Sequence, residues 1–121
     1  MTLLVWVAVV LLGGVGAVLR FLVDRIVSGR LGRLFPYGTL LVNLSGAAVL
    51  GVITGLALGR TEALLAGTAT VGAYTTFSTW MLETHRLAED GESRPAVANV
   101  VVSLALGLAF AWLGRELGAA L

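Results

Sequence analysis

Residues 62–87 read EALLAGTATVGAYTTFSTWMLETHRL, and the middle of this stretch decides how the chain is interpreted. Four hydroxyl side chains fall within five positions of an otherwise apolar run: Thr75, Thr76, Ser78 and Thr79. A serine or threonine can bond to a carbonyl of its own helix and so be tolerated in lipid. Four of them, distributed around a helix, cannot all face lipid unused. Gly72 and the β-branched threonines also favour a helix break, and the backbone groups freed by a break must be buried or bind an ion. An ion-related function is therefore favoured over simple packing.

The composition predicts that this stretch lies in a membrane. Of the 121 residues, 58% are hydrophobic and 12% are charged, and the mean hydropathy is +0.96. A soluble domain carries about 25% charged residues. Four segments reach the roughly 20 residues that a bilayer-spanning helix needs. They lie at about 3–26, 38–58, 62–87 and 95–117.

We therefore predict an all-α, multi-pass protein of the cell membrane with a single domain over residues 1–121, whose third helix is broken at mid-membrane. The apolar run Leu3–Leu12 lacks a basic leader and continues to Arg20, so it is interpreted as part of a retained first helix. Small residues spaced by four in the second span predict close helix packing: Ala47, Gly51, Gly55 and Gly59. Four short helices are few for enclosing a pore, so an oligomer is expected.

The basic residues are distributed unevenly between the two ends of the predicted bundle. One side holds Arg25, Arg30, Arg33, Arg86 and Arg94, and the other holds Arg60 and Arg115. The positive-inside rule then places both termini outside. No basic run suggests nucleic acid as a partner. The absence of cysteine excludes disulfides and thiolate sites.

Other polar residues at membrane depth require a partner or a water-lined path. Asn43 shares a helix face with Thr39 and could either link two helices or face a pore. Asn99, Ser103 and Gly107 are spaced by four and form a stripe on the last span. Arg20, near the end of the first span, is explained by snorkelling more often than by ligand attraction.

These donor types indicate an anion rather than a cation as the ion. A small anion needs hydrogen-bond donors in place of its water, such as amides, hydroxyls and freed backbone N–H groups. The positive edges of aromatic rings contribute in the same way. A cation path or a proton-coupled pump normally places a carboxylate at mid-membrane, and this chain offers almost none there.

Three segments together resemble the CrcB/Fluc fluoride channels. They are Gly13-Gly14-x-Gly16-Ala17-x-x-Arg20, Gly38-Thr39-Leu40-x-x-Asn43-x-x-Gly46 and Gly72-x-x-Thr75-Thr76-Phe77-Ser78-Thr79. The resemblance implies passive export of fluoride through an antiparallel, dual-topology dimer with two pores and a structural sodium ion on the twofold axis. By the same resemblance, Gly72 and Thr75 donate backbone carbonyls to the sodium ion.

The resemblance also assigns roles along the pore. It implies a pore lining made of Asn43, Phe77, Ser78, Thr79, Trp80 and Ser103. Arg20 and Thr39 would lie in an aqueous vestibule, and Glu83 would lie near the pore end. The chain departs from the family at Trp80, where phenylalanine is usual, and at Asn99, where tyrosine is usual. The indole has an electropositive rim and an N–H donor, so it could replace phenylalanine.

Several alternatives stay open on the sequence alone. The arginine asymmetry fits poorly with a chain that inserts both ways, so the chain is either a homodimer or one half of a heterodimer with an oppositely oriented homologue. A proton-coupled exporter of the small multidrug-resistance type would need a glutamate in the first helix, and residues 3–19 contain no acidic residue. A non-conducting membrane subunit would use its polar residues only to link helices. An enzyme is least expected, because the chain has one histidine and no plausible nucleophile–base pair.

Overall fold

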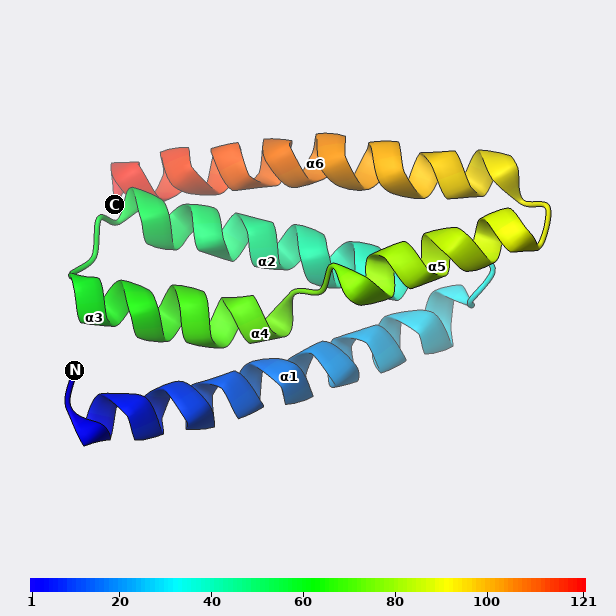
Figure 1. Cartoon of the computed structure of the whole chain (residues 1–121). Coiled ribbons are helices and arrows are strands. Elements are labelled where there is room, and N and C mark those ends of the chain that lie inside the picture. The colour runs from blue at the N-terminus through cyan, green and yellow to red at the C-terminus, as the bar shows by residue number, and fades with distance from the viewer.

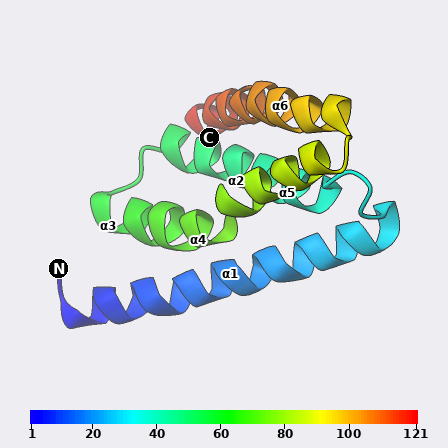
Figure 2. The same cartoon turned by 45° about the vertical axis from the view of Figure 1, so that its right-hand side comes forward.

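The structure, a computed structural model, describes all residues 1–121, and its regular elements are helices without a strand (Figure 1). Three helices are long: α1 (Leu3–Leu31), α2 (Tyr37–Gly55) and α6 (Ser93–Ala120). Between α2 and α6 the chain forms a row of shorter pieces: α3 (Arg60–Ala63), the π-helix η1 (Leu64–Val71), α4 (Gly72–Tyr74) and α5 (Ser78–Glu89). Figures 1 and 2 show this row lying between α1 and α6, with both termini at the same end of the bundle.

Helices α1, α2 and α6 are long and apolar enough to cross a membrane, with mean hydropathies of 2.3, 1.6 and 2.1. This confirms the prediction of an all-helical, multi-pass membrane protein. The predicted boundaries are less accurate. Helix α1 continues to Leu31, where Gly32 ends it with a φ of 82°, and α2 stops at Gly55. Hydropathy marks only the residues suited to lipid, whereas a helix continues until its backbone hydrogen bonding is capped.

Very little of the chain is buried against itself. Only 17 of the 121 residues are buried, and Val42 and Asn99 are the largest fully buried side chains. Large apolar side chains cover the outside of all three long helices instead. A surface of this kind requires lipid or another protein chain around it.

Helices α2 and α6 pack by direct backbone contact. A Cβ added at Gly51 would lie 2.2 Å from the Ala111 carbonyl oxygen, and one added at Gly114 would lie 2.2 Å from that of Ala48. Such close approach is how helices pack in lipid, where apolar burial gives no advantage. The predicted small-residue stripe is therefore correct at Gly51, but it is wrong at Gly59, which lies beyond α2 as the N-cap of α3.

The row of short helices is interrupted after Tyr74. Thr75 is extended, with φ −82° and ψ 161°, and helical structure resumes at Ser78. Gly72, in contrast, is helical with φ −59° and ψ −39°. The interruption therefore falls three residues after the glycine that the sequence suggested as its cause, at the first of the two adjacent threonines. Preceding it, η1 has the i→i+5 bonding that often accompanies functional sites.

Candidate ion pathway

Asn43 holds the interrupted segment to α2. Its side-chain Nδ2 donates to the Thr76 carbonyl at 2.8 Å, and the Thr76 N–H donates to Asn43 Oδ1 at 2.9 Å. The amide thus replaces the helical partners that Thr76 lacks. Each buried backbone group left unpaired would cost about 1 to 3 kcal/mol. The helix-linking role that the sequence left open for Asn43 is therefore present within one chain.

Arg20 contacts the same segment from α1. Its guanidinium donates to the Thr75 carbonyl at 3.5 Å. One turn earlier, Gly16 is buried so closely that an added Cβ would lie 2.2 Å from the Thr70 carbonyl oxygen. Arg20 thus lies well inside α1, which continues to Leu31, rather than near the helix end that the sequence suggested. The close contact at Gly16 positions the guanidinium next to the interruption.

Phe77 and Trp80 form an aromatic pair at the start of α5. Their ring centroids lie 5.6 Å apart at an interplanar angle of 81°, the edge-to-face arrangement. The pair borders a shallow hollow of about 330 Å³, whose other lining residues are Asn43, Gly46, Ala47, Leu50, Thr75 and Thr76. Phe77 is 70% exposed in the single chain. Aromatic edges and an interrupted backbone therefore meet at one open surface of the bundle.

The indole N–H of Trp80 is not free to serve an anion. It donates to the backbone carbonyl of Asn99 on α6 at 3.1 Å. The expectation that this N–H could serve the anion is therefore wrong for this structure. A tryptophan side chain has no second polar hydrogen. Only the C–H edge and the ring faces of Trp80 remain for the hollow.

The predicted hydroxyl track divides into an exposed part and a buried part. Ser78 and Thr79 are exposed, and the Thr79 N–H donates to Thr76 Oγ1 at 3.2 Å at the start of α5. Ser103 on α6 has a buried hydroxyl without a hydrogen-bond partner. The structure thus brings Asn43, Phe77 and Trp80 to one hollow and leaves Ser103 outside its lining.

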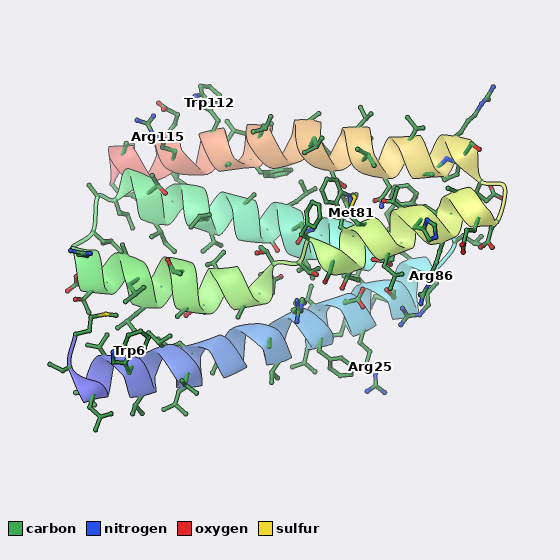
Figure 3. The ribbon with its side chains drawn as sticks, viewed as in Figure 1. Trp6, Arg25, Met81, Arg86, Trp112 and Arg115 are labelled. Carbon is green, nitrogen blue, oxygen red and sulfur yellow. The ribbon has the colours of Figure 1, made fainter.

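Thr39 and Glu83 meet at the arginine-rich end of the bundle. The Thr39 hydroxyl donates to the Glu83 carboxylate, and Thr39 is 3% exposed. Glu83 borders a cavity of about 550 Å³ that also involves Arg33, Arg86, Asp90 and Glu92. Figure 3 shows Arg86 on α5 toward the end of the bundle where α1 finishes, and Arg115 at the opposite end. Thr39 is therefore grouped with Glu83 and not with Arg20, its predicted companion in a vestibule.

Thr84 was not predicted as part of this region, and Asn99 was predicted only as a member of the polar stripe on the last span, without a partner. Asn99 Nδ2 donates to Thr84 Oγ1 at 2.8 Å, and Thr84 Oγ1 donates to the Trp80 carbonyl at 2.9 Å. The available signal was the spacing of Trp80 and Thr84 by one helical turn, which puts both on one face. Their shared partner lies on another helix, so the sequence could not identify it.

Comparison with known proteins places the chain in a family. Residues 7–115 match the family described as CrcB-like protein, Camphor Resistance (CrcB). A protein of Mycobacterium tuberculosis (strain ATCC 25618 / H37Rv), named fluoride-specific ion channel FluC 2, is 64% identical over 115 residues, which cover 95% of this chain and 91% of that protein. A protein of Symbiobacterium thermophilum, named fluoride-specific ion channel FluC 1, is 44% identical over 119 residues, covering 93% and 96% of the two chains. These names describe ion channels and not enzymes. The chain therefore belongs to the CrcB family.

Proposed function

We propose that this protein is a fluoride-selective channel that lets fluoride leave the cytoplasm passively. The observation that carries the proposal is the hollow where the aromatic pair, Asn43 and the interrupted backbone meet. The relatives named fluoride-specific ion channels match nearly the whole length of the chain and support it. The donors available at this surface are C–H edges, amides and hydroxyls, which can replace water around a small anion without binding it tightly.

Transport of this kind needs no energy source beyond the fluoride gradient. Hydrogen fluoride is a weak acid that crosses membranes as the neutral molecule and dissociates at cytoplasmic pH. Fluoride therefore accumulates inside the cell, and an open path allows it to flow outward. In the proposed path, fluoride passes Arg20, then the hollow at Asn43, Phe77 and Trp80, and then the hydroxyls of Ser78, Thr79 and Ser103. Thr39 and Glu83 would border the path at the arginine-rich end.

The proposed channel is an antiparallel dimer in the cell membrane, in which the row from α3 to α5 makes the fourth crossing and its interruption lies at mid-membrane. The position of Phe77 supports this arrangement, because its ring is 70% exposed at the same hollow that Asn43 and the interrupted backbone line. A second chain against this surface would enclose the hollow and turn it into a pore. The large exposed apolar surface of the bundle leaves ample room for both lipid and a partner.

A structural sodium ion at the dimer axis is part of the proposal. The residues fit such an ion at two points. Thr75 is extended, so its carbonyl is outside regular helical bonding, and the Arg20 guanidinium that meets it in the single chain would have to leave this oxygen to the ion. The Thr76 N–H, the usual helical partner of the Gly72 carbonyl, is directed to Asn43 instead. Backbone oxygens of this kind suit a hard cation, which would bring two chains together at this segment.

A heterodimer is the second candidate, and the arginine distribution favours it. Five arginines lie near the end of α1, in the loop after it, or near the connection from α5 to α6: Arg25, Arg30, Arg33, Arg86 and Arg94. Arg60, at the start of α3, and Arg115, near the end of α6, belong to the other end. Such asymmetry gives a chain one preferred orientation. This chain would then need an oppositely oriented homologue as its partner.

The test is fluoride efflux from liposomes that contain only this purified chain, with chloride as the control ion. We expect fast efflux of fluoride without chloride, and a decrease of at least tenfold in Phe77→Leu, which leaves the packing of the single chain intact because Phe77 is exposed. Dimer formation is followed by size exclusion on the same samples. A folded dimer without efflux would contradict the homodimeric channel. Efflux restored by an oppositely oriented homologue would establish the heterodimer.

A further inference from the structure

The contact between α5 and α6 beside the hollow is a closed circuit of hydrogen bonds among three residues. Trp80 Nε1 donates to the Asn99 carbonyl, Asn99 Nδ2 donates to Thr84 Oγ1, and Thr84 Oγ1 donates to the Trp80 carbonyl. The three distances are 3.1, 2.8 and 2.9 Å. We refer to Trp80, Thr84 and Asn99 as the α5–α6 clamp. It holds Trp80 at two points, the indole N–H and the backbone carbonyl.

The circuit determines which way the Asn99 amide faces. A threonine hydroxyl has a single hydrogen, and Thr84 donates it to the Trp80 carbonyl. Thr84 can therefore only accept from Asn99, so the NH₂ group faces Thr84 and Oδ1 faces away. Asn99 is 1% exposed, and its Oδ1 has no hydrogen-bond partner. The orientation is thus imposed by chemistry and leaves one acceptor buried and unpaired.

An unpaired buried oxygen destabilises a structure, and an apolar side chain of the same size would avoid that cost. A residue that served only to pack α5 against α6 would be better replaced by leucine. The presence of an amide at position 99 is therefore explained by the hydrogen bond that its NH₂ group donates. Its Nδ2 holds Thr84, and Thr84 lies one helical turn from the ring that borders the hollow.

We propose that Asn99 and Thr84 are positioning residues that hold Trp80 edge-to-face with Phe77, so that α6 fixes the width and the anion selectivity of the aromatic part of the path. This inference rests on the proposed function as a fluoride channel. The clamp uses the only N–H of the indole and leaves the C–H edge and ring faces to meet the anion. An indole released from the clamp would change the width of the path. It would also change the group that meets the anion, because the Trp80 N–H could then turn toward the hollow in place of the C–H edge.

The first experiment compares variants in two backgrounds. Thr84→Val removes two clamp bonds and Asn99→Leu removes one, each with little change in side-chain volume. In the Trp80 chain, we expect each to reduce the fluoride-to-chloride efflux ratio at least fivefold. In a Trp80→Phe chain, which has no indole N–H to hold, the same changes should alter the ratio less than twofold. Equal effects in both backgrounds would mean that Asn99 and Thr84 only pack helices, and would overturn the inference.

A second measurement tests the clamp directly and does not depend on transport. Trp6 and Trp112 are exposed, at 54% and 61%, so Trp6→Phe with Trp112→Phe leaves Trp80 as the only indole. The indole N–H should exchange with deuterium slowly in this chain and at least tenfold faster after Thr84→Val. Unchanged exchange would overturn the inference. A chain with slow exchange and no fluoride efflux would instead refute the proposed channel, and with it the role of the clamp in selectivity.

Discussion

The α2–α6 pair and the interrupted segment between α4 and α5 represent two different ways of holding helices together in lipid. The α2–α6 contact is backbone against backbone, made possible by glycines such as Gly51 and Gly114. The interrupted segment depends instead on polar side chains from its neighbours, among them Asn43 and Arg20. In the α2–α6 pair, each helix makes its backbone hydrogen bonds within itself. In the interrupted segment, the backbone N–H and C=O groups need partners from other helices.

The difference shows where function can be located in so small a protein. A regular helix pair has no free donors or acceptors, so it provides rigidity without interacting with an ion. An interrupted helix exposes backbone groups, and Asn43, one of the side chains that satisfy them, lines the adjacent hollow. Asn43 both links helices and borders the hollow, so the two alternatives considered for it are not exclusive.

The largest effect is expected from breaking the backbone contact. Gly114→Leu would force a side chain into space where a Cβ alone would lie 2.2 Å from the Ala48 carbonyl oxygen. Backbone cannot move aside as a flexible side chain can, so the cost should exceed the roughly 1 to 3 kcal/mol that is typical of overpacking. We expect at least a tenfold loss of folded protein on size exclusion. The matched control is Gly107→Ala in the same helix, where nothing lies within 4 Å, and its yield should be unchanged. Equal yields from the two variants would show that α2 and α6 do not pack as described.

The next effect is expected from removing the polar support of the interrupted segment. Asn43→Leu keeps the size of the side chain but leaves the N–H and the carbonyl of Thr76 without partners. Each such group costs about 1 to 3 kcal/mol. We expect the variant to remain folded but less thermostable, with fluoride efflux at least a hundredfold lower. Thr54→Val on the same helix removes an exposed hydroxyl away from the hollow and serves as the control. Full fluoride efflux from Asn43→Leu would show that the Asn43 amide is not part of the path.

The smallest effect on stability is expected at Ser103. Its buried hydroxyl has no partner, so Ser103→Ala removes an uncompensated polar group and should leave thermal stability within about 0.5 kcal/mol of the original or slightly above it. If the hydroxyl donates to fluoride in passing, efflux should fall severalfold. Thermal unfolding and efflux measured on the same preparation separate the two effects. A large loss of stability would show that Ser103 has a partner in the dimer.

Local chemistry that any helix obeys was enough to mark several residues as unusual. Asn43 and the hydroxyl cluster at Thr75 and Thr76 are polar groups at apparent membrane depth, and such groups must be paired wherever they lie. This requirement predicted that Asn43 and the interrupted segment need polar partners, and the structure pairs Asn43 with Thr76. The position of the interruption was less well predicted, because Gly72 permits a break without requiring one, whereas the loss of helical partners at Thr76 depends on Asn43 from another helix.

Composition and the length of the apolar runs were enough to predict an all-helical membrane protein, because both depend only on the energetics of transfer into lipid. The sequence alone also indicated the family, through motifs that lie within single helices. Three contacts became known only from the tertiary structure: Trp80 with Asn99, Thr39 with Glu83, and Arg20 with the Thr75 carbonyl. Each of these contacts joins two separate segments of the bundle, and the register between packed helices is set by the close backbone approach at glycines. A hydropathy pattern has no information on that register, because every face of a helix in lipid can be equally apolar.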